Sequence, residues 1–149
     1  MPGLLLPPCG VRVCVRGGRR CVFDPQRRRY VALTPEEWVR QHFVQYLVRY
    51  KGYPSSLIAN EVEISVGGKR LRADTILYDS RLRPQMVIEY KAPHVRLSQE
   101  VVSQIASYNS LLRAPYITVS NGRQHLCLRR DSGTGRYALL CGVPDYVEL

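Results

Sequence analysis

The sequence predicts a single α/β domain over residues 1–149, with a mixed central β-sheet flanked by two main helices. Three observations predict this class. Residues 34–52 and 98–113 repeat apolar side chains at helical spacing and begin with capping signals. Runs rich in β-branched and aromatic residues surround both segments. Because the second helix connects two such runs, at least one strand pair is expected to be parallel, which makes the sheet mixed.

Residues 1–29 are expected to form a basic hairpin extension. Val11, Val13 and Val15 alternate with arginine and cysteine, and the glycine pair at 17–18 suits a tight turn. The segment "RRCVF" then returns, followed by the basic loop "DPQRRR" and a short extended piece, "YVAL". Three roles are open for this extension: contact with phosphates, completion of the central sheet, or a dimer contact.

The clearest helix spans residues 34–52. Thr34 is a good N-cap, Pro35 suits the first helical position, and Glu37 completes a capping box. Gly52 suits the C-terminal stop. The apolar stripe of this helix consists of Val39, Phe43, Leu47 and Tyr50.

Three strands are expected next, at 56–66, 69–79 and 84–92, and a Gly67-Gly68 turn joins the first two. The second helix covers 98–113 with Ser98 as its cap. Its stripe consists of Val101, Ile105, Tyr108 and Leu112. The remaining strands are expected within 114–130, around an Asn-Gly turn, and at 135–143.

The charge of the chain favours a polyanionic partner. Lys and Arg number 22 against 12 Asp and Glu, which gives a net charge of +10 at pH 7. Much of this charge lies early, at Arg12, Arg16, Arg19, Arg20, Arg27, Arg28 and Arg29. Such a field favours nucleic acid, with DNA as the expected partner; the alternative is an ordinary basic surface.

Cysteine usage and hydropathy exclude several other classes. The five cysteines contain no CxxC pair, so we expect reduced thiols in a cytoplasmic protein rather than a disulfide framework or a zinc site. The first ten residues lack the pattern of a signal peptide, and no stretch approaches the ~20 apolar residues of a membrane span. No phosphate-binding GxxxxGK[ST] loop is present, so an ATP-driven motor is not expected.

Three charged residues stand within the predicted strands. Asp74 lies in one strand, and Glu89 and Lys91 lie near the end of the next. In a register that places Asp74 opposite Glu89, Tyr78 opposes Gln85 and residues 79–84 form the loop. Opposed residues share a face with Cβ atoms roughly 4.5–5.5 Å apart, and Lys91 shares that face by alternation.

This cluster suits a divalent cation. Two adjacent carboxylates repel unless a proton or cation compensates, and oxygen ligands suit Mg²⁺ or Mn²⁺. A bound ion can activate water and polarise a phosphoryl oxygen, while Lys91 can stabilise transition-state charge. The alternative is a cross-strand salt-bridge network on a solvated face.

These residues resemble the PD-(D/E)xK nuclease superfamily. The segment "ADTILYD" supplies its Asp, and "IEYKAP" supplies its Glu-x-Lys. More specifically, residues 30–149 resemble the N-terminal nuclease domain of type I restriction enzyme R subunits. In this comparison "QIASYN" matches that family's Gln-x-x-x-Tyr element on the following helix.

The resemblance implies a restriction-endonuclease-like fold and Mg²⁺-dependent cleavage of phosphodiester bonds. Asp74 and Glu89 would bind metal, and Lys91 would assist the nucleophile. Gln104 and Tyr108 would stand at the nuclease site and contact DNA, although Tyr108 also continues an apolar stripe. An acid from the first helix often joins such sites: Glu37 is the first candidate and Glu36 the second, with helix capping as the competing role of Glu37.

We therefore expect a metal-dependent deoxyribonuclease domain. The alternative is a nucleic-acid-binding module with weak or lost cleavage, inside a larger restriction or repair assembly. Either function would use the early arginines for phosphate contact, namely Arg16, Arg19, Arg20, Arg27, Arg28 and Arg29. Other subunits of such an assembly are expected partners, a homodimer is open, and no membrane partner is expected.

Overall fold

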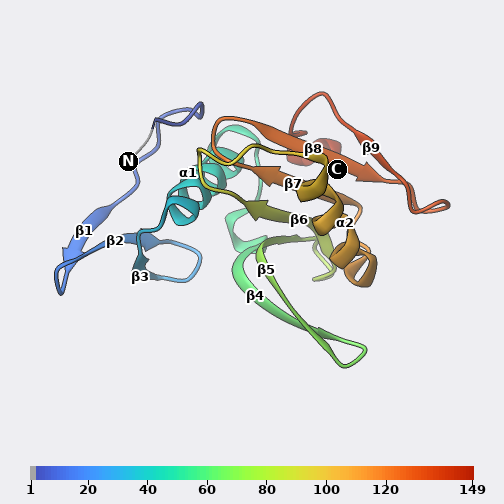
Figure 1. Cartoon of the computed structure of the whole chain (residues 1–149), viewed down its shortest axis with the longest axis horizontal. Coiled ribbons are helices and arrows are strands. Elements are labelled where there is room, and N and C mark those ends of the chain that lie inside the picture. The colour runs from blue at the N-terminus through green and yellow to red at the C-terminus, as the bar shows by residue number, and fades with distance from the viewer. Residues whose placement is uncertain (1–2) are drawn as a thin grey trace.

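The computed structural model describes residues 3–149 as two β-sheets and two helices (Figure 1). The smaller sheet contains β1 (Val13–Arg16), β2 (Arg19–Asp24) and β3 (Arg29–Ala32). The larger sheet contains β4 (Ile58–Val66), β5 (Lys69–Tyr78), β6 (Pro84–Tyr90), β7 (Tyr116–Ser120), β8 (His125–Arg130) and β9 (Tyr137–Leu139). The helices are α1 (Pro35–Tyr50) and α2 (Gln99–Leu112), and two short 3₁₀ turns cover Ser55–Leu57 and Tyr146–Glu148.

The larger sheet is mixed, as the sequence predicts. Its six strands follow chain order from β4 to β9, and neighbouring strands are antiparallel except for β6 and β7. The parallel pair is the one that α2 connects, because a parallel neighbour requires a crossover. The predicted α/β class is thus confirmed. Within residues 3–149, no helix has the length and apolar character needed to cross a membrane.

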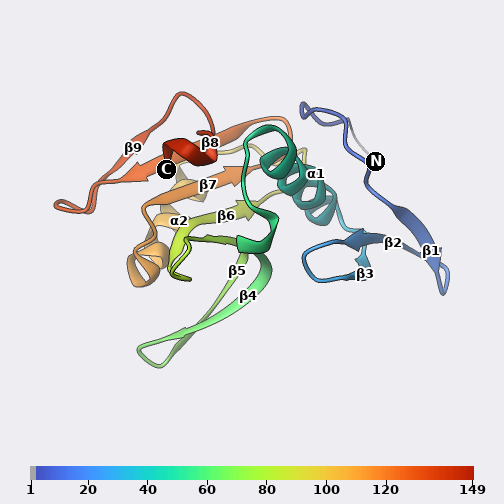
Figure 2. The ribbon, with the colours of Figure 1, turned by 180° about the vertical axis from the view of Figure 1, so that it is seen from behind.

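The two helices cover opposite faces of this sheet. Three residues of the predicted α1 stripe, Val39, Phe43 and Leu47, are fully buried and pack into the main core together with Tyr116, whereas the fourth, Tyr50, is exposed. The next residue along β7, Ile117, packs instead with Ile105 of α2. Since successive side chains of a strand point to opposite faces, these two contacts place α1 and α2 on either side of the sheet (Figures 1 and 2).

The two predicted helix caps have different outcomes. The Thr34 hydroxyl accepts a hydrogen bond of 3.1 Å from the backbone N–H of Glu37, which is the N-cap contact that the sequence predicts. Ser98 occupies the N-cap position of α2, but its hydroxyl makes no capping bond. The backbone at Ser98 therefore follows the prediction while the side-chain contact does not.

The pairing of β5 with β6 follows the predicted register over its central part. Thr75 pairs with Ile88, and the two following pairs continue the same alignment. The alignment then shifts between Leu77 and Tyr78, so Tyr78 opposes Pro84 and the predicted pairing with Gln85 is wrong. The cause is a bulge, which adds one residue to one strand at the end of a hairpin.

The N-terminal extension does not take one of its three expected roles, completion of the central sheet. The β1–β2 hairpin forms as predicted, but β3 pairs with β2 in a separate sheet, so this segment does not complete the central sheet. The small sheet is tied to the body through Asp24, which is fully buried. Its carboxylate accepts a bond from Arg27 and another of 3.0 Å from Asn60 of β4.

Replacing Asp24 by alanine is expected to destabilise the whole protein. Without this carboxylate, the guanidinium of Arg27 and the amide of Asn60 lose a buried partner, at a cost of about 3 kcal/mol in the free energy of unfolding. Urea unfolding measures this loss. The control variant Glu63→Ala removes an exposed carboxylate and should change stability by less than about 0.5 kcal/mol. Equal, small effects in both variants would show that Asp24 does not join the sheets.

Candidate active site

A cleft of about 500 Å³ opens between the small sheet, α1 and the strands β4 to β6. Residues at the end of the small sheet form one wall, and the first turns of α1 form another. Five residues that the sequence predicted for the site line it: Arg27, Glu37, Asp74, Glu89 and Lys91. Glu36, the second-choice acid, is also exposed along this cleft. Residues separated by more than sixty positions thus meet in one concavity.

Asp74 and Glu89 meet on adjacent strands. The register that pairs Thr75 with Ile88 continues outward to place Asp74 beside Glu89. The Asp74 carboxylate accepts a bond of 2.9 Å from the backbone N–H of Tyr90, and the Glu89 carboxylate lies 3.4 Å from the backbone nitrogen of Asp74. Each carboxylate therefore faces a backbone N–H of the adjacent strand, which limits how far the two carboxylates can separate.

This proximity changes the protonation of Glu89. Burial, followed by hydrogen bonding to Asp74 and the charge of Asp74, raises the pKa of Glu89 to about 8. The hydroxyl of Tyr108 donates to Glu89 and partly opposes this rise. At neutral pH and without a cation, Glu89 therefore keeps its proton, as one member of a closely spaced carboxylate pair does.

Lys91 stands directly after β6 with an uncommitted ammonium. Its backbone N–H donates a bond of 2.9 Å to the carbonyl of Ser120 in β7, which fixes the main chain at this point. Among the described residues, no carboxylate lies within 4.0 Å of its Nζ atom. The side chain lines the cleft with both acids, so its charge is available to a ligand there.

A buried arginine that the sequence patterns did not single out supports Asp74. Arg40 of α1 is 5% exposed, and its guanidinium donates a bond of 2.8 Å to the backbone carbonyl of Asp74. It also pairs with Glu61 of β4 and, at 3.2 Å, with Glu37. Although burial opposes its charge, these two acids raise the pKa of Arg40. The sequence gives no signal for this role, because a single charged residue in a helix is ordinarily solvated.

The ladder between β4 and β5 is interrupted at this same point. Asn60 pairs with Thr75 and Val62 pairs with Ala73, whereas Glu61 adopts a left-handed backbone conformation with φ +55°. Such a conformation is uncommon for a residue other than glycine, and it needs support from its surroundings. Here the support comes from Arg40, whose guanidinium donates hydrogen bonds to both the Asp74 carbonyl and the Glu61 carboxylate.

Glu37 reaches the cleft, but cations already hold its carboxylate. One oxygen accepts bonds of 2.6 Å from Arg27 and 2.9 Å from Gln41, and the other faces Arg40. Glu37 takes part in helix capping only through its backbone N–H, which donates to the Thr34 hydroxyl. Arg27 in turn is bonded to Asp24 and Glu37, so its guanidinium is part of this internal network rather than free for phosphate.

The two predicted residues of α2 are placed differently. Tyr108 is partly buried and its hydroxyl bonds to Glu89, while its ring packs against two apolar clusters. Burial and the charge of Glu89 raise its pKa well above the ordinary value, which keeps the hydroxyl a donor. Gln104, one turn earlier, is exposed and does not line the cleft.

The other arginines predicted to bind nucleic acid are exposed on the small sheet. They are Arg16, Arg19, Arg20, Arg28 and Arg29. The guanidinium of Arg16 lies 4.1 Å from the centre of the Tyr30 ring, a cation–π contact that orders the side chain at the surface. None of these five arginines lines the cleft, which the small sheet borders through Val31 and Ala32.

The donor set of the cleft fits Mg²⁺ or Mn²⁺ in one respect. Mg²⁺ is commonly held by one or two carboxylates, with waters and substrate phosphates completing its shell. Asp74 and Glu89 supply two such carboxylates. Over residues 3–149, no group of three or more His, Cys, Asp or Glu side chains is placed to hold a metal ion.

The raised pKa of Glu89 predicts an inverse dependence of stability on pH. In the absence of divalent ions, the folded protein keeps a proton that the unfolded chain loses above pH 4.5. The free energy of unfolding should therefore fall as pH rises from 4.5 toward 8. Glu89→Gln should remove this effect and be more stable than the wild type by about 1–2 kcal/mol above pH 8.

Chemical unfolding at a series of pH values checks this expectation. Glu63→Gln, which neutralises an exposed carboxylate, serves as the matched control and should follow the wild type. A Glu89→Gln protein less stable than the wild type at alkaline pH would mean that Glu89 is an ordinary ionised carboxylate in the folded state.

Comparison with known proteins places this architecture in a family. A family model described as "type I restriction enzyme R protein N terminus (HSDR_N)" matches residues 35–144, which include the whole cluster of Asp74, Glu89 and Lys91. No curated protein matches the chain. A fragment structure of an HsdR subunit of a type I restriction enzyme from Vibrio vulnificus YJ016 is similar in fold, with 22% identity and a TM-score of 0.54.

The match covers 75% of this chain and 24% of the Vibrio chain, so this chain spans about a quarter of that structure's length. A cryo-EM structure of a DrdV–DNA complex is similar over 70% of this chain and 10% of that chain, with 22% identity and a TM-score of 0.47. On the strength of the family match over residues 35–144, the chain belongs to the type I restriction enzyme R protein N-terminus family.

Proposed function

We propose that this protein is a divalent-metal-dependent endonuclease domain that hydrolyses phosphodiester bonds of DNA. One observation carries the proposal: Asp74 and Glu89 meet beside the unpaired ammonium of Lys91 in a single cleft. Membership of a restriction-enzyme family supports the same reaction class. An ordinary surface salt-bridge network would pair Lys91 with one of the acids, and no such pair occurs among the described residues.

Asp74 and Glu89 would hold the metal ion. The raised pKa of Glu89 supports this role, because a divalent cation would compensate the two neighbouring carboxylates in place of the Glu89 proton, and it prefers such oxygen ligands. When bound, the ion supplies Lewis-acid polarisation of the phosphate and lowers the pKa of a bound water. Loss of the Glu89 proton would accompany binding, because ligand carboxylates must be ionised.

The protein's own groups have separate roles. The Lys91 ammonium stabilises negative charge that develops on the phosphate and orients the attacking water. Tyr108 fixes the Glu89 carboxylate from the α2 side, and Arg40 fixes the backbone of Asp74 from the α1 side. The two acids are thus positioned from both faces of the sheet before substrate arrives, which limits reorganisation during the reaction.

The exposed arginines of the small sheet would collect the DNA backbone. With a net charge of +10, the chain attracts a polyanion, and contacts with phosphates bring it close to a cleft whose acids alone would repel it. A binding module without cleavage would use the same arginines, so this surface by itself does not separate the two functions. Because relatives in this family are parts of restriction enzymes, we also propose that other subunits of such an assembly are partners.

Cleavage of supercoiled DNA tests the proposal. With Mg²⁺ or Mn²⁺ the wild type should nick or cut the plasmid, and chelator should stop it. Lys91→Ala should lose at least about 10²-fold in rate, because it removes a charge aimed at the reacting phosphate. Lys51→Ala is the matched control: Lys51 pairs with Asp145 on another surface, so this variant should retain activity.

Thermal unfolding of each variant must accompany the assay, so that loss of activity is separated from loss of fold. Equal cleavage by the wild type and Lys91→Ala, or cleavage that survives chelation, would refute the metal-dependent mechanism. Salt-sensitive binding without any cleavage would instead identify the binding module.

A further inference from the structure

We propose that the β4–β5 hairpin is a second DNA-binding arm, which contacts backbone phosphates of a duplex on the far side of the cleft from the small sheet. This inference rests on the proposed function and extends it, because it assigns part of the DNA contact to a segment outside the cleft. The residues that carry the contact are Lys69 and Arg70 at the end of the hairpin, and neither belongs to a sequence motif of the site.

The hairpin extends beyond the sheet as a two-stranded ribbon. β4 and β5 remain paired as far as Val66 and Lys69, whereas the ladder between β5 and β6 starts only at Thr75. Residues 62–73 therefore have no third strand beside them, and the ribbon projects from the body (Figures 1 and 2). A two-stranded ribbon of this kind fits the major groove of B-DNA.

One face of the ribbon is polar and leads to the cleft. Arg72 is opposite Glu63, and Arg70 is opposite Ser65, so alternation places these four side chains on one face. The Arg72 guanidinium bonds to Glu61, which lines the cleft. Arg70 lies four residues before Asp74, a separation of roughly 13 Å along an extended strand.

This separation suits a duplex. A major groove is about 12 Å wide, so a duplex with one phosphate beside Asp74 presents further phosphates at the reach of Arg70. The small sheet, which carries the exposed arginines, borders the same cleft through Val31 and Ala32. A single strand would engage one of these surfaces, whereas a duplex would engage both.

The charges at the end of the ribbon are available. Lys69 and Arg70 are exposed on opposite faces at the end of the ribbon, because they are consecutive along β5, and within the described part of the chain neither forms an ion pair. Glu63 is the only carboxylate on the ribbon beyond Glu61, and it stands against three cations, Lys69, Arg70 and Arg72, while Glu61 is already bonded to Arg72 and Arg40. The end of the ribbon is therefore positive, and contact with phosphates would release the counterions of DNA.

The direction of the ribbon is fixed relative to the acids. Arg40 bonds to both Glu61 and the Asp74 carbonyl, and Arg72 bonds to the other oxygen of Glu61. These bonds tie the base of the ribbon to the strand that carries Asp74. The apolar residues of the ribbon, such as Ile64 and Leu71, are half-buried, so its free face offers charge rather than an apolar surface for a protein partner.

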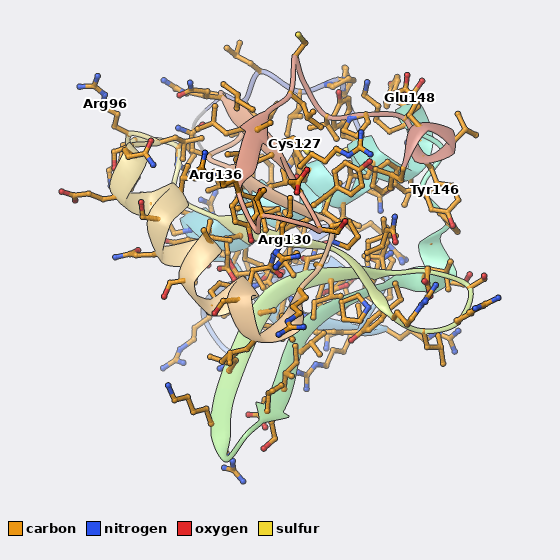
Figure 3. The ribbon with its side chains drawn as sticks, turned by 90° about the vertical axis from the view of Figure 1, so that its right-hand side faces the viewer. Arg96, Cys127, Arg130, Arg136, Tyr146 and Glu148 are labelled. Atoms are coloured by element: carbon orange, nitrogen blue, oxygen red, sulfur yellow. The ribbon has the colours of Figure 1, made fainter. Side chains whose placement is uncertain are left out.

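Binding of a 30-base-pair duplex in chelator, measured by fluorescence anisotropy at several salt concentrations, tests the arm. The double variant Lys69→Gln/Arg70→Gln should bind about tenfold more weakly at low salt. Its log–log salt slope should be smaller by about 1.8, or ~0.9 for each phosphate that the variant no longer neutralises. The control Arg129→Gln/Arg136→Gln removes the same charge from exposed positions of β8 and the β8–β9 turn. Figure 3 shows Arg136 well apart from the end of the ribbon.

The control should bind like the wild type, because it lowers the net charge by the same amount as the ribbon variant but leaves the ribbon itself unchanged. Equal affinity and slope in the two double variants would overturn the arm, as would a wild type that does not bind duplex DNA. Plasmid cleavage, run in parallel, separates this result from the proposed function. If the wild type cleaves the plasmid but the ribbon variant binds DNA normally, the nuclease is supported and the arm is refuted. If the ribbon variant alone loses binding but no protein cleaves, the arm is supported and the nuclease is refuted.

Discussion

The antiparallel register of β5 and β6 forces two carboxylates into one small volume. Main-chain hydrogen bonds fix this register, and the buried pairs next to it, such as Thr75 with Ile88, prevent a slip that would turn core side chains toward solvent. Asp74 and Glu89 therefore stay close together, and burial together with the neighbouring Asp74 raises the pKa of Glu89. The fold thus keeps two carboxylates so close that they would repel each other when both are ionised, and a bound cation would remove this repulsion.

The elements around this pair hold it in place but do not neutralise the two side chains. Arg40 brings a positive charge from α1, but it acts on the Asp74 carbonyl and on Glu61 and Glu37, and so leaves the two acidic side chains facing the cleft. Truncating this buried cation would leave Glu37 with Arg27 alone and Glu61 with Arg72 alone. Its connection to Glu61 also stabilises the left-handed backbone at the point where the β4–β5 ribbon leaves the sheet. Support for the site and direction of the ribbon thus depend on one side chain.

Much of the fold and the acid pair could be predicted because local patterns carry them. Helical spacing marked α1, and hairpin geometry set the register of Asp74 and Glu89. The remaining features are decided by tertiary interactions. The bulge at Tyr78 depends on how the turn packs, and a run of three arginines gives no signal that Arg27 alone turns inward to Asp24. Arg40 could not be predicted as a buried residue because a single charged residue in a helix is ordinarily solvated.

Binding of Mn²⁺ tests most directly whether the paired acids form a cation site. Electron paramagnetic resonance distinguishes free from bound Mn²⁺, and Asp74→Asn keeps an acceptor for the backbone N–H of Tyr90 while removing the charge. The account predicts that the wild type binds Mn²⁺ at neutral pH and releases the Glu89 proton as it does so, and that Asp74→Asn loses most of this binding with its fold intact. Equal binding by both proteins would contradict it.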